Sequence, residues 1–281
     1  MFVSSIDRLA TLLFFHPASR TVRERSRRRI PILMYHSISE GDGNGSDSYY
    51  MTRCSPARFA EQMEFLHQNG YRTLSLTAAA CSLQCGEEVL GPTVVITFDD
   101  GYHDFYTNAF PILSRYGFTA TVFLPTGLIG SDSAMSFKGK KCLTWDDARE
   151  LHRAGVDFGS HTVSHPQLKT LDTTSLTYEL RESKVTLEDE LGSCADSFCY
   201  PYAFPEQDFS FRKKLTALLQ ECGYVRGVCT ILGLASPRDD RFLLRRLPVS
   251  SRDDSRFLQA KLEGGYDWLH AFQYAAKLIR A

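Results

Sequence analysis

The stretch TVVITFDDGY at residues 93–102 joins six β-favouring residues directly to two carboxylates and a glycine. A continuous apolar run of this length is typical of a buried parallel strand. In folds with parallel sheets, ligand-binding groups lie just past the C-terminal ends of the strands. Asp99 and Asp100 occupy that position and are therefore candidate functional residues. A lone Asp-Asp-Gly is more typical of a simple turn, so the functional interpretation depends on the other strand ends.

Strand and helix patterns alternate on both sides of this stretch. Helices of this length between strands predict parallel βαβ units, and seven or eight strands are enough to close a barrel. We find no internal linker or repeat after residue 30 and therefore predict a single domain over 30–251. The expected strands are 30–35, 71–74, 93–98, 119–124, 156–160, 197–200, 224–229 and 242–249, and the expected helices are 55–70, 76–85, 102–116, 144–155, 172–191 and 206–222.

The composition narrows the class of ligand and the compartment. The 281 residues have a formal net charge of -1, which argues against nucleic-acid binding, because that function leaves an excess of basic residues. Eight irregularly spaced cysteines in a chain of this size are typical of free thiols in a reducing compartment, so we expect a cytoplasmic protein. Cys81 and Cys85 have metal-ligand spacing, but no second Cys/His pair with matching spacing is nearby. They are therefore more typical of two small apolar residues on one face of a helix.

Residues 1–29 form a separate basic arm. An apolar run at 9–15 precedes most of seven arginines, whereas a secretory signal has its positive charge before the apolar core. The run is also too short to span a bilayer, which takes about 20 apolar residues. With Asp7 and Glu24 the arm has a net charge of +5, so we expect either peripheral contact with an anionic membrane or a solvated arm.

The last segment, 252–281, is expected to be a helical extension. Its apolar residues recur at spacings of three and four, which predicts one helix packed against the barrel. Contact with a membrane or a partner is the less favoured alternative, because Lys277 and Arg280 are the only cations in the last turns. The apolar stripe consists of Trp268, Leu269, Phe272, Ala275, Ala276 and Ile279.

Several further reactive side chains follow predicted strands. His36 follows the first strand, and His161 and His165 follow the strand at 156–160. In a barrel the strand ends share one face, so these residues should meet the Asp-Asp pair. One carboxylate and two imidazoles form a three-ligand set of the zinc type, with open positions for water and substrate. Asp100, His161 and His165 can supply it, and the neighbouring carboxylate can accept a proton from metal-activated water.

TFDDG, SHTVSHPQL and YPY, in this order, closely resemble the first three motifs of the polysaccharide deacetylases with a NodB homology domain, carbohydrate esterase family 4. PILMYHSI and LTWDDARELHRAGVDFGSHT resemble the branch found in bacterial exopolysaccharide systems. The resemblance covers residues 30–250. It implies a deformed (β/α)7 barrel, a divalent metal that is usually zinc, and hydrolysis of an N-acetyl group on an amino sugar.

The same resemblance implies a role for each matching residue. Asp99 matches the general base, and Tyr202 matches the tyrosine whose backbone N–H helps to hold the oxyanion. The metal ligands it implies are Asp100, His161 and His165.

Two positions depart from the family pattern. Where much of the family has an arginine that orients the base, this chain has Cys199. The arginine is expected from RRLPV instead, with Arg246 the better match and Arg245 the second, although both are also compatible with surface cations. The late histidine that serves many members as general acid is missing, and His36 is the candidate by elimination, with a structural role as the alternative.

The leading hypothesis is a metal-dependent hydrolase acting on an N-acetylated polysaccharide or lipid-linked glycan. One alternative is a deformylase or other deacylase of a lipid-linked sugar. Another is a catalytically idle glycan-binding protein with an aromatic groove. The oligomeric state is left open. The aromatic residues that could line such a groove are Tyr49, Tyr50, Phe204 and Phe209.

Overall fold

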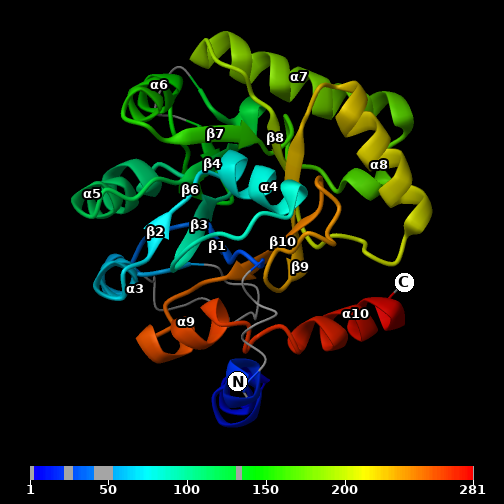
Figure 1. Cartoon of the computed structure of the whole chain (residues 1–281). Coiled ribbons are helices and arrows are strands. Elements are labelled where there is room, and N and C mark those ends of the chain that lie inside the picture. Colours follow the sequence, from blue (N-terminus) through cyan, green and yellow to red (C-terminus); the bar gives the residue numbers. More distant parts are fainter. Residues whose placement is uncertain (1–2, 22–27, 41–52, 131–134, 281) are drawn as a thin grey trace.

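The computed structural model describes residues 3–21, 28–40, 53–130 and 135–280. Within these ranges, seven parallel strands close a barrel in the order β1-β10-β9-β8-β7-β4-β3, and β3 pairs with β1 to complete the ring. The deformed (β/α)7 barrel expected from the sequence is therefore confirmed (Figure 1). The strands are β1 (Ile32–Tyr35), β3 (Thr93–Phe98), β4 (Thr121–Leu124), β7 (Asp157–Ser160), β8 (Ser197–Cys199), β9 (Arg226–Leu232) and β10 (Leu244–Pro248).

Helices surround the barrel and begin where the sequence places their caps. The Ser55 side chain accepts a hydrogen bond from the Arg58 backbone N–H, and Thr144 and Asp147 form the expected reciprocal capping box. Gly192 ends its helix in the left-handed conformation that favours glycine. The helices are α3 (Pro56–Gln68), α4 (Leu76–Cys85), α5 (Phe110–Arg115), α6 (Trp145–Arg153), α7 (Thr173–Leu191) and α8 (Phe209–Glu221), with 3-10 turns at Thr126–Leu128 and Leu168–Thr170.

The helix α4 closes one end of the barrel. Its apolar residues pack with inward-facing residues of several strands in one buried cluster, and α4 lies across the barrel in Figure 1. Residues two apart on a strand face the same side. Thr97 and Asp99 therefore face the barrel interior, as Val95 of this cluster does. Along β3 the interior therefore changes from an apolar layer beneath α4 to a polar layer at the C-terminal end. The cluster includes Ile32, Leu76, Ala79, Ala80, Leu83, Val95, Phe123, Val228 and Leu244.

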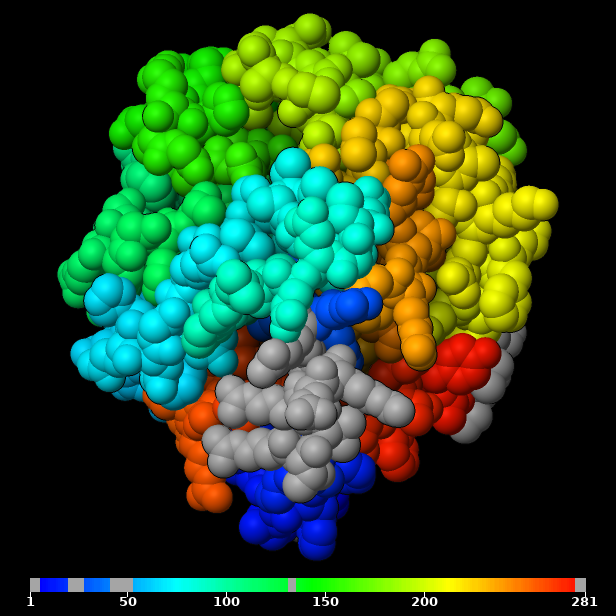
Figure 2. Space-filling view, viewed as in Figure 1, coloured from blue at the N-terminus to red at the C-terminus, as the bar shows by residue number. Residues whose placement is uncertain are grey.

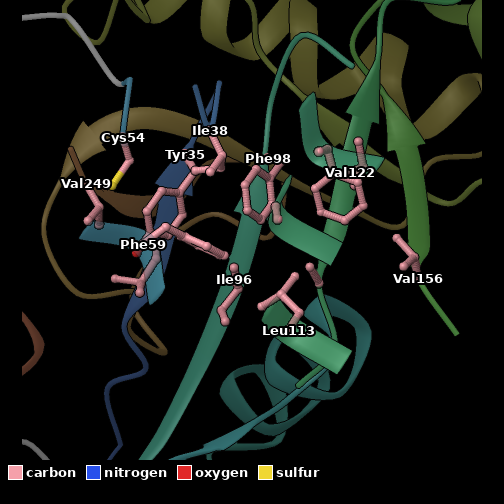
Figure 3. Packing of buried hydrophobic residues seen from close by; sticks show 14 of the residues in the cluster. Tyr35, Ile38, Cys54, Phe59, Ile96, Phe98, Leu113, Val122, Val156 and Val249 are labelled. Atoms are coloured by element: carbon pink, nitrogen blue, oxygen red, sulfur yellow. The ribbon is translucent and has the colours of Figure 1, made fainter. Parts of the chain in front are cut away.

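A second core lies between the barrel and its outer helices. Tyr35 of β1 stacks on Phe98 of β3 at 5.3 Å, and the Phe59 ring of α3 meets Tyr35 edge-on at 5.2 Å (Figure 3). The Tyr35 hydroxyl donates to Gln62 Oε1 at 2.9 Å, so its buried polar atom is satisfied. This packing fixes β1 and β3 side by side and thereby positions the residues that follow both strands.

Three elements differ from the sequence expectations. The helix expected at 102–116 begins as the π-helical segment η3 (Phe105–Ala109) and continues as α5, because Pro111 has no N–H for an α-helical bond. The expected strand at 71–74 is only β2 (Arg72–Thr73), outside the barrel on β3. An antiparallel hairpin of β5 (Ser136–Phe137) and β6 (Lys140–Lys141) was not expected.

The two ends of the chain pack against each other. Residues 3–21 are helical, as α1 (Val3–Ala10), η1 (Thr11–Phe15) and α2 (His16–Thr21), and lie beside α9 (Ser255–Leu262) and α10 (Leu269–Arg280) (Figure 1). The described part of the arm is thus not a frayed chain. Nor does the C-terminal stripe lie entirely on the barrel, because Phe272 is 64% exposed and Trp268 stacks on Phe15.

Candidate active site

Arg246 and Asp99 form a buried ion pair inside the barrel. Arg246 is on β10 and Asp99 follows β3, and their side chains are 0% and 3% exposed. Guanidinium atoms Nη1 and Nη2 donate to Oδ1 and Oδ2, each at 2.7 Å. Burial alone would raise the pKa of Asp99, but the Arg246 guanidinium lowers it to about 2. The carboxylate is therefore ionised and held in one orientation by a two-point contact.

The rest of the guanidinium is also fixed. Nη1 donates to Thr97 Oγ1 and Nη2 to Cys199 Sγ, both at 3.1 Å, and Nε donates to the Cys229 carbonyl oxygen at 3.1 Å. Arg245, the second candidate, instead donates to Asp239 Oδ1 at 3.1 Å. The structure thus places Arg246 beside Asp99 and within reach of Cys199, the position where much of the family has its arginine.

Replacing Arg246 by methionine is expected to lower the free energy of unfolding by about 3–5 kcal/mol, because it leaves the Asp99 charge buried without a partner. Since the folded-state pKa of Asp99 is depressed, the pair stabilises the protein above about pH 4 and this contribution is lost as pH falls towards 2. The deficit of the variant should therefore shrink in acid. Urea denaturation at several pH values measures it.

Arg245→Met is the matched control on the same strand. Its partly exposed ion pair with Asp239 should contribute about 1 kcal/mol or less. Equal losses of stability from the two substitutions would contradict a special role for the buried pair.

Asp100, His161 and His165 converge beside this pair, and their ligand atoms lie within 4.8 Å of one another. Asp100 Oδ1 is 3.6 Å from His161 Nε2 and 3.2 Å from His165 Nε2. Tyr102 Oη donates to Asp100 Oδ2 at 3.0 Å, whereas Oδ1 is buried and has no hydrogen-bond partner among the described residues. An unpaired carboxylate oxygen facing two imidazole nitrogens is the donor set of a divalent cation, so these residues fit a metal.

The His161 ring is oriented by the backbone. Its Nδ1 lies 2.8 Å from the Cys199 carbonyl oxygen, which can only accept, so Nδ1 carries the proton. The Nε2 lone pair is then directed at Asp100. This is the second contact that metal-binding histidines commonly make, and it supports the same site.

A second set, Asp99, His161 and Cys199, also has ligand atoms within 4.8 Å of one another. It fits a cation less well, because Arg246 already donates to both Asp99 oxygens and to Cys199 Sγ. The guanidinium supplies the positive charge at that position. Neither set includes Cys81 or Cys85, which are exposed on α4, and all eight cysteines have free thiols.

Strained backbone is concentrated around the site. Every non-glycine residue with positive φ in the described ranges belongs to it or to the adjoining hairpin. Such conformations cost free energy and persist where the surrounding structure imposes them, often at functional sites. Gly101 also has positive φ, at 60°, and a Cβ there would lie 2.7 Å from Leu124 Cδ2, so the Asp-Asp-Gly turn requires glycine. The non-glycine residues are Asp100 (71°), Lys138 (50°), Thr162 (71°), His165 (56°) and Tyr202 (58°).

His36 and Tyr202 border the two groups of residues. His36 Nε2 is 4.0 Å from Asp99 Oδ2, and burial lowers its pKa. The Tyr202 ring stands edge-on to His165 at 4.5 Å. Its backbone N–H has no acceptor among the described residues, and its side chain is 45% exposed at the mouth of the site.

The sequence analysis missed the contribution of the β5–β6 hairpin. Phe137 packs on His165 at 4.9 Å, and Lys138 Nζ lies 3.5 Å from Asp100 Oδ2 and 5.4 Å from the centre of the Tyr202 ring. The signal in the sequence was only Gly139, which allows a tight turn. Nothing local indicates where such a short hairpin will pack.

Other candidates lie elsewhere. His270, the only histidine after His165 in the sequence, is on α10, and its Nε2 lies 2.7 Å from Glu206 Oε1. Of the proposed aromatic groove, Phe204 is fully buried and Phe209 is exposed on α8, while Tyr49 and Tyr50 lie outside the described residues. The described aromatic residues therefore do not form the expected groove.

The barrel and the carboxylate and imidazole groups at its C-terminal face define a hydrolase of the NodB-like type. Sequence comparison agrees, because the profile described as Polysaccharide deacetylase matches residues 86–226. The YxkH protein of Bacillus subtilis (strain 168) is 31% identical over 232 residues, 83% of this chain and 75% of its own length. The chain belongs to the polysaccharide deacetylase family and is a hydrolase of N-acetyl amide bonds.

Two further relatives have more specific names. The poly-beta-1,6-N-acetyl-D-glucosamine N-deacetylase of Escherichia coli (strain K12) is 32% identical over 140 residues, which are 46% of this chain but 20% of that protein. Among solved structures, the Streptococcus pyogenes deacetylase PplD in complex with acetate superposes with a TM-score of 0.73 at 28% identity, covering 83% of this chain and 98% of that chain.

Proposed function

We propose that this protein removes N-acetyl groups from an amino sugar within a polysaccharide or lipid-linked glycan of the exopolysaccharide type, using a divalent cation, zinc by preference. The observation that supports this most directly is the division of two adjacent carboxylates between two environments. Asp99 is fixed by Arg246, and Asp100 faces two imidazoles. The name of the Escherichia coli relative supports an N-acetylated glucosamine polymer as the substrate class.

Asp100, His161 and His165 would hold the cation. Burial would raise the pKa of Asp100, but the adjacent His161 and His165 imidazoles keep it far below its usual range, so the carboxylate is charged. A bound divalent cation polarises a carbonyl oxygen and acidifies water, whose pKa can fall to about 7. Tyr102 holds the second Asp100 oxygen and leaves Oδ1 directed at the imidazoles.

Asp99 is the proposed general base. Its carboxylate is ionised at neutral pH, so it can accept a proton, but a pKa of about 2 makes it a weak base. Proton transfer to it is therefore favourable only from water that is itself acidified. Arg246 keeps both Asp99 oxygens in place during this transfer. The Tyr202 backbone N–H, which lacks a described acceptor, is the proposed donor to the oxyanion that forms on the acyl carbon.

His36 is the proposed general acid for the leaving amine. Because burial lowers its pKa, the ring is neutral before reaction and must gain a proton during the cycle. Asp99 Oδ2 lies 4.0 Å from His36 Nε2, so a small movement allows Asp99 to pass on the proton it has accepted. This route returns both residues to their starting charge.

Replacing His36 by alanine should reduce kcat for an N-acetyl amide by about 10²–10⁴, the usual contribution of a positioned acid. The phenolate of an activated aryl ester departs without protonation, so hydrolysis of such an ester should be nearly unchanged. His67→Ala on α3 is the control histidine and should affect neither substrate. If both substrates lose rate equally in His36→Ala, the residue positions substrate or supports structure.

The function as a whole is tested by product release from a panel of defined oligosaccharides. Acetate release from an N-acetylglucosamine oligomer, dependent on added zinc and abolished by a chelator, is the expected result. An N-formyl analogue tests the deformylase alternative in the same assay. Preference for the formyl substrate would remain consistent with metal-dependent amide hydrolysis, but it would show that the acyl group is formyl and not acetyl.

A further inference from the structure

The N-terminal helical segment, residues 3–19, faces the protein with its polar side. Asp7 and Thr11 are 7% and 0% exposed. On the opposite side, four large apolar side chains face solvent, and we call them the apolar face. An amphipathic surface helix normally buries its apolar side, whereas here Leu12 and Phe15 pack inward beside the two polar residues and the other large apolar side chains do not. The apolar face consists of Ile6 (61% exposed), Leu9 (59%), Leu13 (54%) and Phe14 (68%).

Specific bonds hold the segment in this orientation. The Tyr266 hydroxyl donates to Asp7 Oδ2 at 3.1 Å, and Trp268 Nε1 donates to Thr11 Oγ1 at 3.0 Å. Phe15 stacks on the same Trp268 ring at 4.5 Å. Because these contacts are directional and two of their donors are on buried or half-buried aromatic rings, the segment cannot roll over without losing them. The exposure of the apolar face is therefore built into the packing.

An ion pair and a hydrogen bond at the edges strengthen this arrangement and leave the apolar face clear. Arg8 pairs with Asp254, and His16 Nε2 lies 2.8 Å from Glu263 Oε2. Phe272 of α10 adds one more exposed ring, edge-on to Trp268 at 5.3 Å. In Figures 1 and 2 the segment lies at the outer edge of the molecule beside α9 and α10.

The charge of the next residues indicates what covers this face. Residues 20–29 contain six arginines and one glutamate, a net charge of +5. A second copy of the chain would bring the same positive charge to the contact. A bilayer with anionic headgroups offers both an apolar layer and negative charge, and apolar side chains beside arginines are typical of helices that lie in its surface.

We propose that residues 3–19 dock this protein onto the surface of an anionic lipid bilayer, with the apolar face in the acyl boundary and the net positive charge of the sequence 20–29 favouring anionic headgroups. The segment lies in the plane of the membrane. None of the helices that the structure describes is long and apolar enough to cross one. The proposal is independent of the acyl substrate, because none of these residues belongs to the active site.

Co-sedimentation of the full chain with phosphatidylcholine vesicles, with and without phosphatidylglycerol, tests the proposal. Binding is expected only with the anionic lipid and should weaken as salt is raised. Leu13→Ser with Phe14→Ser should lower the partition coefficient at least about tenfold, because two large apolar side chains are lost from the contact. Hydrolysis of a soluble oligosaccharide by this variant should be unchanged, which shows that it is folded.

A matched control is Leu90→Ser with Phe209→Ser, which removes two apolar residues that are even more exposed than Leu13 and Phe14 but lie elsewhere, and should leave the partition coefficient unchanged. Absence of binding, or equal binding to neutral vesicles, would overturn the proposal. So would light scattering that shows a dimer which Leu13→Ser with Phe14→Ser dissociates, because the apolar face would then be an interface between copies.

Discussion

Asp99→Asn is expected to keep the divalent cation and to lower kcat for acetate release by about 10²–10⁴, because asparagine cannot accept the proton that the reaction must remove. Both Asp99 oxygens accept hydrogen bonds from Arg246, and Asp99 is not one of the three proposed metal ligands. Replacing Asp99 should therefore leave the metal content unchanged. Elemental analysis gives the number of metal ions per chain, and steady-state kinetics gives kcat. Loss of the metal in proportion to activity would instead make Asp99 a ligand.

The substitution has a second effect that must be separated from chemistry. Asp99→Asn leaves the Arg246 charge buried without its partner, and broken buried pairs typically cost about 3–5 kcal/mol. Asp99→Asn combined with Arg246→Met removes both charges and should recover much of that stability without recovering turnover. Recovery of activity in the double variant would show that the loss was structural.

His161→Ala is expected to lose the cation and, with it, nearly all hydrolysis. Removing one of three protein ligands should weaken metal affinity by more than the roughly 10–100-fold that loss of a supporting contact costs. A zinc titration by calorimetry measures this directly and does not depend on activity. The buried Asp100 carboxylate would also lose one of its two imidazole neighbours.

His152→Ala serves as the control for this substitution. His152 is a half-buried histidine on α6 whose Nδ1 lies 3.4 Å from the Val156 carbonyl oxygen, remote from the ligand set. The His152→Ala variant should bind zinc with the same stoichiometry and affinity as the unsubstituted protein. Stoichiometric zinc in His161→Ala would show that the ligand assignment is wrong.

Local patterns in the sequence were sufficient for the barrel. Apolar runs such as 93–98 and capping signals such as Thr144 with Asp147 are decided by neighbours in the chain, and the structure confirms them. The family motifs identified Asp99, Asp100 and the two histidines. Their convergence was predictable because the ends of parallel strands share one face of a barrel. The choice between Arg245 and Arg246 was less certain, because adjacent residues on one strand face opposite sides and one residue of register exchanges them.

The sequence by itself therefore determined the strands and helices of the barrel and the carboxylate and imidazole residues that follow the strands. Only the tertiary structure decided that Arg246 takes both Asp99 oxygens, that Lys138 and Phe137 of a two-residue-per-strand hairpin border Asp100 and His165, and that the N-terminal helix turns its polar side inward. The physical reason is distance along the chain. Asp99 and Arg246 are 147 residues apart, and Thr11 and Trp268 are 257 apart, so their contacts depend on how whole elements pack and leave no local pattern.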